Sequence, residues 1–212
     1  MAIRKFSASS LTSPNSKSYK LWDQETTLGT FESIAAITAD ASGTSAFTFT
    51  NIPQNYTNLQ IRLTAKTNRA TYAHDDYGIK VGNGTLDSGN NYSCHKIQSE
   101  YVSGYSNVYA AGAADTTMYF IGSAISTAGN GAFGVGIIDI LDYANTNKYK
   151  TIRSFSGGDS NGAVSGYLPN IVFGSGSWRN TAAIDTISVY PSGGGSNWVQ
   201  YSTACLYGIR GA

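Results

Sequence analysis

The sequence predicts an all-β protein: an antiparallel β-sandwich, jelly-roll-like, preceded by an extended N-terminal arm. Two observations lead to this fold class. Apolar and polar residues alternate with a period of two over many short segments, which is typical of strands with one buried face. Runs with the helical period and capping residues are absent, so no amphipathic helix is expected. With 212 residues, the chain is long enough to bury a core as one domain of this class.

Composition supports the same class and excludes some partners. The chain holds 24 Gly and 15 Tyr, and only 13% of its residues are charged, against about 25% in an average soluble protein. Abundant Gly, Ser, Thr and Asn indicate many turns between short strands. Because the formal net charge is only +1, we expect neither nucleic acid nor a membrane as a partner. Low charge with much Thr and Tyr is common on extracellular and virion surfaces.

The first 28 residues differ from the rest and form the predicted arm, with the sandwich over residues 29–212. Apolar residues in the arm are sparse and show no period, so a packed element is not expected. Two alternatives stay open: a solvated tail, or a strap that orders only on a partner surface. The strap would use scattered basic and apolar side chains: Arg4, Lys5, Phe6, Leu11, Lys17, Lys20 and Trp22. The basic start lacks a following apolar stretch, so no signal peptide is expected.

Strand character begins at Phe31 and recurs to the end of the chain. In the segment 58–66, Leu59, Ile61 and Leu63 face one way, while the polar residues between them face the other. Gly134 and Gly136 would weaken an isolated strand, and they fit a bulge or the close approach of another backbone. About ten or eleven strands are expected, from the segments 31–39, 46–53, 58–66, 77–84, 91–97, 117–125, 131–143, 150–157, 167–174, 182–191 and 199–209.

The stretch "IDILDYANTNKYKTIRSFSG" predicts a hairpin whose loop is polar but carries no catalytic residue types. Asp139 and Arg153 should pair across its two strands. Asn145 and Asn147 tolerate left-handed backbone geometry, which a tight reversal needs. We expect the loop to contact a neighbouring subunit through Tyr143, Asn145, Asn147 and Tyr149. A second contact loop is predicted over residues 100–115, where Tyr101, Tyr105 and Tyr109 recur at every fourth position.

No motif for catalysis, metal binding or a cofactor is found. His74, Asp75 and Asp76 are adjacent, but neighbouring residues of an extended chain point to opposite faces. A solvated turn before the strand is therefore favoured over a calcium site, and no metal is expected. Cys94 and Cys205 lack the spacing of a metal motif; two buried free thiols are favoured over a disulfide. The sequence predicts a protein that is not an enzyme and has no cofactor.

Four motifs in order resemble a group of tailed-phage virion proteins: "FESIAAITADASGTSAFTFTNIPQNYTNLQIRL", "IDILDYANTNKYKTIRSFSG", "GSWRNTAAIDTISVYPSGG" and "CLYGIRG". The resemblance covers most of residues 31–210. It implies a compact β-sandwich on the surface of a phage particle, synthesised in the host cytoplasm. The basic arm departs from the pattern of the group.

Two functions follow from this resemblance. The first is a capsid decoration or cement protein, a homo-oligomer such as a trimer, that binds the major capsid protein or other virion subunits through its arm and sandwich edges. The second is a tail fibre or receptor-binding module that recognises host surface glycans. Copy number per particle separates them, because a decoration protein is present in hundreds of copies and a tail tip in few.

Overall fold

The computed structural model describes residues 30–70, 72–100, 106–126, 131–159, 170–193 and 196–211. These residues form thirteen strands and no helix. The predicted arm lies outside them. The strands are β1 Phe31–Thr38, β2 Phe47–Phe49, β3 Asn58–Ala65, β4 His74–Asn83, β5 Thr85–Leu86, β6 Tyr92–Glu100, β7 Ser106–Asp115, β8 Met118–Ile125, β9 Gly134–Leu141, β10 Lys150–Gly157, β11 Asn170–Trp178, β12 Thr186–Pro191 and β13 Thr203–Ile209.

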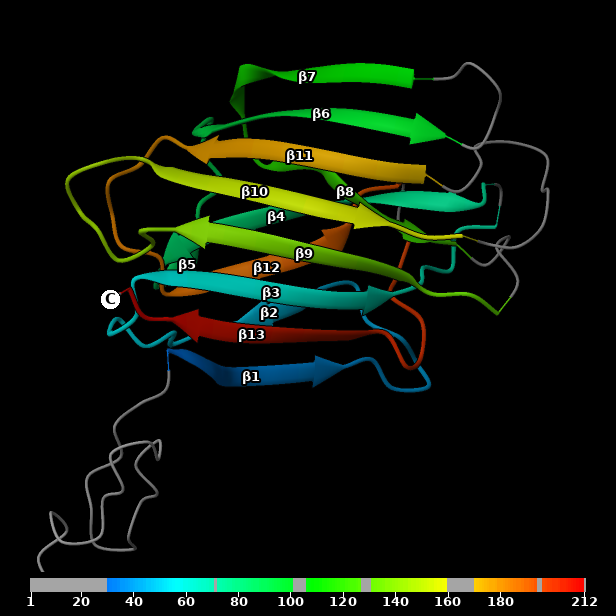
Figure 1. The fold of residues 1–212 in the computed structure, drawn as a ribbon, viewed down its shortest axis with the longest axis horizontal. Coiled ribbons are helices and arrows are strands. Elements are labelled where there is room, and N and C mark those ends of the chain that lie inside the picture. The colour runs from blue at the N-terminus through cyan, green and yellow to red at the C-terminus, as the bar shows by residue number, and fades with distance from the viewer. Residues whose placement is uncertain are drawn as a thin grey trace, which may run out of the picture.

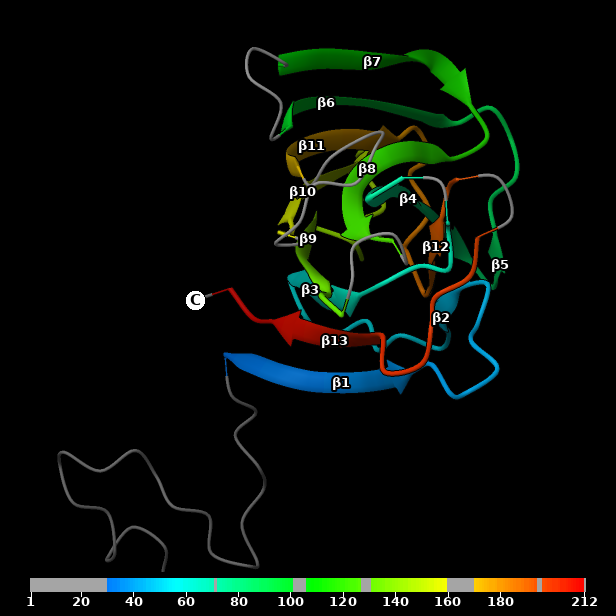
Figure 2. The ribbon, with the colours of Figure 1, turned by 90° about the vertical axis from the view of Figure 1, so that its right-hand side faces the viewer.

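The strands form two packed antiparallel sheets, which confirms the predicted β-sandwich. The larger sheet has eight strands in the order β1-β13-β3-β9-β10-β11-β6-β7. The smaller has five: β2-β12-β4-β5, with β8 also paired to β4. Figure 1 looks onto the larger sheet, with the smaller one behind it, and Figure 2 shows the layers from the side. One face of the larger sheet is therefore covered and the other is open.

The core lies between the sheets and contains the residues that the period-two pattern assigned to it. Leu59, Ile61 and Leu63 are buried on β3. From the smaller sheet, Phe47 stacks on Trp198 with the ring centroids 5.4 Å apart. Full burial of such side chains contributes about 1.5–3 kcal/mol each, so this layer supplies much of the stability of the fold.

Glycines on the inner face of the larger sheet let β8 approach it closely. A Cβ on Gly134 would lie 3.0 Å from the backbone nitrogen of Ile125. A Cβ on Gly136 would lie 2.5 Å from the hydroxyl oxygen of Tyr77, which is fully buried. The expected close approach of another backbone is thus confirmed at Gly134, whereas Gly136 makes room for a buried tyrosine side chain.

Three local expectations were wrong. Residues 106–115 form strand β7 rather than a loop, because they pair with β6. His74 and the two acids after it belong to β4 rather than to a solvated turn, because they pair with β8. Thr85 and Leu86, inside a predicted turn, form the short strand β5. In each case pairing with a distant or returning segment overrides local turn chemistry.

We predict that Gly136→Ala lowers the free energy of unfolding by about 1–3 kcal/mol, because the new methyl group overlaps the Tyr77 hydroxyl. Tyr77→Phe removes that hydroxyl and leaves the ring carbon 3.4 Å from the added Cβ. The double variant should therefore recover most of the loss. Urea unfolding of both single variants and the double variant measures this coupling, and strictly additive costs would contradict it.

Candidate functional site

The open face of the larger sheet carries a cluster of exposed apolar side chains on five neighbouring strands. Their exposed fractions run from 40% to 76%. We call these seven residues the apolar face; Figure 1 looks onto the strands that carry it. They are Val135 and Ile137 on β9, Phe155 on β10, Ile171 and Phe173 on β11, Ile97 on β6 and Val108 on β7.

Strand register aligns five of these side chains in one row across the sheet. Ile137 pairs with Phe155, and Phe155 pairs with Phe173. Phe173 pairs with Ile97, which pairs with Val108. Side chains of directly paired residues lie about 4.5–5.5 Å apart at their Cβ atoms, so the row is continuous.

On β10 and β6 the polarity beneath the apolar face is inverted relative to an ordinary half-buried sheet, whereas β9 buries Ile138 and Ile140 in the usual way. Phe155 is 56% exposed, while its neighbours Ser154 and Ser156 are buried. Ile97 is 58% exposed, while Lys96 and Gln98 on either side of it are buried. A strand with only one covered face would place its apolar residues inward. The inversion makes the outer face the candidate binding surface of the described residues.

An ion pair between the sheets makes this inversion tolerable. The Lys96 ammonium donates to both carboxylate oxygens of Asp76 on β4, at 3.0 and 3.1 Å. Both side chains are largely shielded from solvent. A buried charge is strongly unfavourable unless it is paired and hydrogen-bonded, so this contact fixes Lys96 inward and Ile97 outward.

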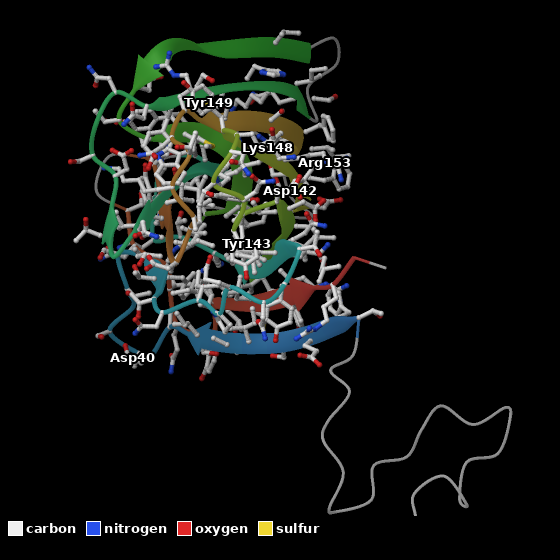
Figure 3. The ribbon with its side chains drawn as sticks, turned by 90° about the vertical axis from the view of Figure 1, so that its left-hand side faces the viewer. Asp40, Asp142, Tyr143, Lys148, Tyr149 and Arg153 are labelled. Atoms are coloured by element: carbon white, nitrogen blue, oxygen red, sulfur yellow. The ribbon has the colours of Figure 1, made fainter. Side chains whose placement is uncertain are left out.

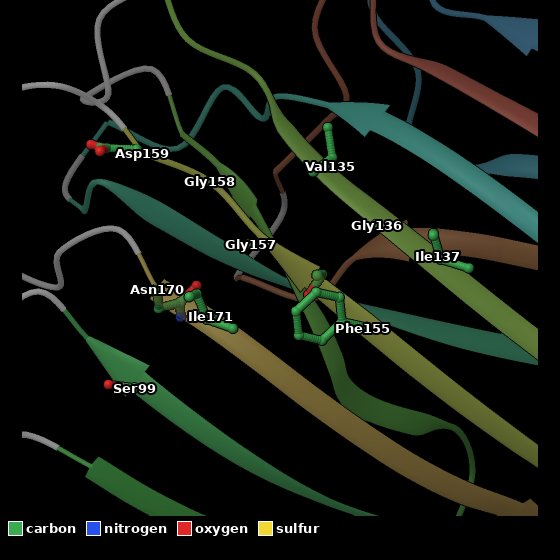
Figure 4. Close-up of a pocket in the computed structure, with 11 residues that line it drawn as sticks. Ser99, Val135, Gly136, Ile137, Phe155, Gly157, Gly158, Asp159, Asn170 and Ile171 are labelled. Atoms are coloured by element: carbon green, nitrogen blue, oxygen red, sulfur yellow. The ribbon is translucent and has the colours of Figure 1, made fainter.

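A hollow interrupts the apolar face beside Gly157, with a volume of about 650 Å³. Gly157 pairs with Val135 on one side and Ile171 on the other, and it places no side chain between them. Phe155 and Ile137 also line the hollow, as Figure 4 shows. The result is a mostly apolar socket, with Asp159 also in its lining, about as large as a small ligand site.

One polar group at this hollow has no partner. Asn170 lines it and is 4% exposed, and its side-chain Nδ2 forms no hydrogen bond. A buried donor without an acceptor costs about 1–3 kcal/mol. Because Nδ2 is itself shielded from solvent, this donor is a local cost to the fold and is not presented to the hollow.

A polar row borders the apolar face. Arg153 donates to Asp139 at 3.1 Å, which confirms the predicted pair. Gln60 donates to the other Asp139 oxygen at 2.9 Å. Because about half of the Arg153 side chain is exposed, the pair contributes little stability. The pair neutralises the Asp139 carboxylate at the border of the apolar face.

The predicted contact loop of the hairpin is only partly a surface. Tyr143 is buried and donates its hydroxyl to the backbone oxygen of Pro53, so it cannot contact a partner. Asn147 and Tyr149 are exposed and Asn145 is half-buried. Figure 3 shows the separation of Tyr143 from the outer residues Lys148 and Tyr149.

The left-handed residue of the hairpin was also assigned wrongly. It is Asp142, with φ of 48°, rather than Asn145 or Asn147. Asn145 instead accepts the backbone N–H of Asn147 through its side-chain oxygen at 2.8 Å. This is an Asx-type turn, the other way in which Asn stabilises a reversal.

Lys150 is the structural centre of the loop, and sequence reasoning missed it. It is fully buried. Its ammonium donates to the backbone oxygens of Asn145, Lys148 and Thr181 at 2.5, 3.1 and 3.1 Å. Burial lowers the pKa of Lys150. The polar and nearly uncharged loop thus supplies carbonyl groups to one buried cation.

The His74 segment is structural. His74 and Asp75 are buried, and Asp75 accepts from Arg69 at 3.0 Å, while Asp76 turns to Lys96. The adjacent carboxylates thus have separate partners, as expected from an extended chain. Burial raises the pKa of Asp75. Among the described residues, no group of three or more His, Cys, Asp or Glu is arranged to hold a metal ion.

The two cysteines are free thiols, as favoured from the sequence. Cys94 is buried on β6 and Cys205 is half-buried on β13. Burial raises the pKa of Cys94 to about 11. A thiol with so high a pKa is protonated at neutral pH and is a poor nucleophile.

Several predicted contact residues cannot be placed. Tyr101 and Tyr105 lie outside the described residues, and Tyr109 lies on β7. All seven arm residues also lie outside them: Arg4, Lys5, Phe6, Leu11, Lys17, Lys20 and Trp22. The predicted role of the arm stays a prediction.

Comparison with models of known protein families finds no match, and a search among curated proteins finds no relative. None of the described residues belongs to a helix long and apolar enough to cross a membrane. Function has to be inferred from the residues of this chain, and the apolar face is the described feature that points most directly to binding.

We predict that Lys150→Met lowers the free energy of unfolding by about 2–4 kcal/mol, because it leaves three backbone carbonyls without their donor. Lys148→Met is the matched control two residues away. Lys148 pairs with Asp142 at the exposed surface, so its loss should cost less than about 1 kcal/mol. Chemical denaturation measures the free energy of unfolding of both variants. Equal losses for the two would contradict the proposed structural role of Lys150.

Proposed function

We propose that this protein is a non-enzymatic structural component of a tailed-phage particle, displayed on the outer shell as a capsid decoration or cement protein. The observation that carries the proposal is the apolar face. Seven exposed apolar side chains gather there, and two of the strands that carry them, β10 and β6, bury polar residues on their other side. Such a surface favours permanent contact with another protein subunit.

Energetics supports contact over chemistry. Each side chain of the apolar face is roughly half-exposed, so covering it contributes about 1 kcal/mol. Together the seven side chains contribute about 7 kcal/mol before the entropic cost of association. Within a particle, where subunits are held at high local concentration, this is enough to keep a surface covered.

The resemblance to tailed-phage virion proteins supplies the kind of assembly. Its four motifs map onto β1 to β3, the β9–β10 hairpin, the β11–β12 region and β13. Three of the strands under the apolar face belong to these motifs: β9, β10 and the end of β11. The proposed partners are the major capsid protein, other virion subunits and further copies of this chain.

Quantitative mass spectrometry of purified particles of the phage that encodes this chain tests the proposal. We expect the protein in hundreds of copies per particle. Treatment that removes outer decoration while leaving heads intact should release it. Absence from particles, or fewer than about a dozen copies at the tail, would contradict a decoration role.

Glycan recognition by a tail module is the second candidate, and one observation favours it. The hollow is lined by the aromatic ring of Phe155 together with the polar residues Ser99 and Asp159. Sugar rings stack on aromatic faces, and polar groups beside the ring fix their orientation. Saturable binding of a host surface glycan, abolished by Phe155→Ala, together with a low copy number, would favour this function over decoration.

The arm provides a separate prediction. Arg4, Lys5, Lys17 and Lys20 would each contribute only about 0.2–1 kcal/mol in exposed ion pairs, so Phe6, Leu11 and Trp22 should matter more. We expect that deletion of residues 1–24 strongly reduces incorporation into particles while the sandwich still folds. Normal incorporation of the shortened chain would show that the sandwich alone makes the attachment.

A further inference from the structure

The apolar face needs a covering surface that is itself apolar and uncharged. The remaining exposed large apolar residues that the structure describes do not form one. Leu141 lies at the other end of β9 from Val135, Phe31 lies on β1 at the far edge of the same sheet, and Tyr149 and Tyr201 lie outside the strands. Among the described surfaces of this chain, the surface that matches the apolar face is the apolar face of another copy. The seven residues include no charge, so two copies facing each other bring no like charges together at their centre.

The face also contains a projection and a recess that fit each other. Phe173 is 49% exposed and pairs directly with Phe155. The hollow lies beside Gly157, two residues further along β10. Diagonal neighbours of this kind are about 7–8 Å apart. Two copies can be related by a two-fold axis that lies in the plane of the interface. When this axis is midway between Phe173 and the hollow, and perpendicular to the line that joins them, each Phe173 lies against the hollow of the other copy.

The size of the face suits such a pair. The five strands that carry the face, polar border included, lie about 4.8 Å apart and are each about eight residues long at about 3.3 Å per residue, so their outer side covers about 600 Å². A stable interface buries about 600–1,000 Å² on each partner. A contact in which both copies use the same surface closes at two subunits and does not propagate into fibres, which fits a particle component that must stay soluble before assembly.

We propose that two copies of this protein pair through their apolar faces, with Phe173 of each copy seated in the hollow beside Gly157 of the other. The inference deepens the proposed structural role by naming the partner of the same face. The pairing is tested on the purified protein, whereas the proposed function is tested on phage particles. Either one can therefore fail while the other holds.

Sedimentation velocity of the purified full-length protein tests the pairing. Over about 1–200 µM, which brackets the affinity of a small interface, we expect a monomer–dimer equilibrium that shifts to the dimer. Phe173→Asp should weaken the dimer by at least 100-fold, because it places a carboxylate in each apolar hollow. Tyr149→Asp is the matched control: Tyr149 has the same exposed fraction as Phe155, 56%, but lies on the hairpin loop.

A charge-swap pair tests the register. Ile171 lines the hollow and is 58% exposed, so Ile171→Lys should also abolish the dimer without unfolding the chain. Mixing the Phe173→Asp and Ile171→Lys proteins should restore a heterodimer. In it, one contact is native and the other joins the introduced carboxylate to the introduced ammonium. Circular dichroism checks that each variant is folded. Because the two substitutions lie on opposite sides of the proposed contact, each one tests the dimer independently.

Any of the following results would contradict the pairing. A monomer at every concentration would show that the face does not bind itself. A dimer that resists both face variants, or is lost with Tyr149→Asp, would place the contact elsewhere. A trimer would exclude the two-fold arrangement. Failure of the mixed variants to form a heterodimer, with each variant folded, would exclude the seating of Phe173 in the hollow.

Discussion

Tyr77 sets the distance between the two sheets, and most of the architecture depends on that distance. Its ring lies against Gly122, its direct partner on β8, where a Cβ would come within 2.1 Å of the ring. Its hydroxyl reaches Gly136 on the opposite sheet, and Trp198 packs at a tilt with the centroids 6.3 Å apart. A tyrosine can span the interior here only because glycine stands at both of its contacts.

Once β8 is held against the larger sheet, the inner face at the β10, β11 and β6 end becomes a mixed environment. β8 packs directly on these strands, and buried serines, Lys96 and Gln98 line the space. Polar groups are tolerated there because Lys96 has Asp76 as a partner. The apolar residues that alternate with them then have to face outward. The open apolar face is thus a consequence of how the interior is built.

Sequence reasoning reached the sandwich, the hairpin, the β3 alternation and the Asp139–Arg153 pair, because each depends on local spacing. It did not reach the apolar face. In "SFS" the period of two identifies a strand but leaves open which side is buried, and ordinary polarity would place Phe155 inside. The side is decided by contacts between the sheets, such as the Lys96–Asp76 ion pair, which strand periodicity does not reveal. Lys150 was missed for the same reason, since one of its three acceptors, Thr181, is distant in sequence.

The hairpin and the apolar face are linked through register. Shifting β10 by one residue relative to β9 would exchange every inward and outward side chain, burying Phe155 and exposing Ser154 and Ser156. The hollow would disappear as well, since Gly157 would no longer lie between Val135 and Ile171. Lys150 opposes such a slip, because its ammonium reaches its three carbonyls only when the strand starts at that residue with its side chain inward. The loop therefore acts at a distance from the apolar face: it fixes the register that turns the apolar row outward.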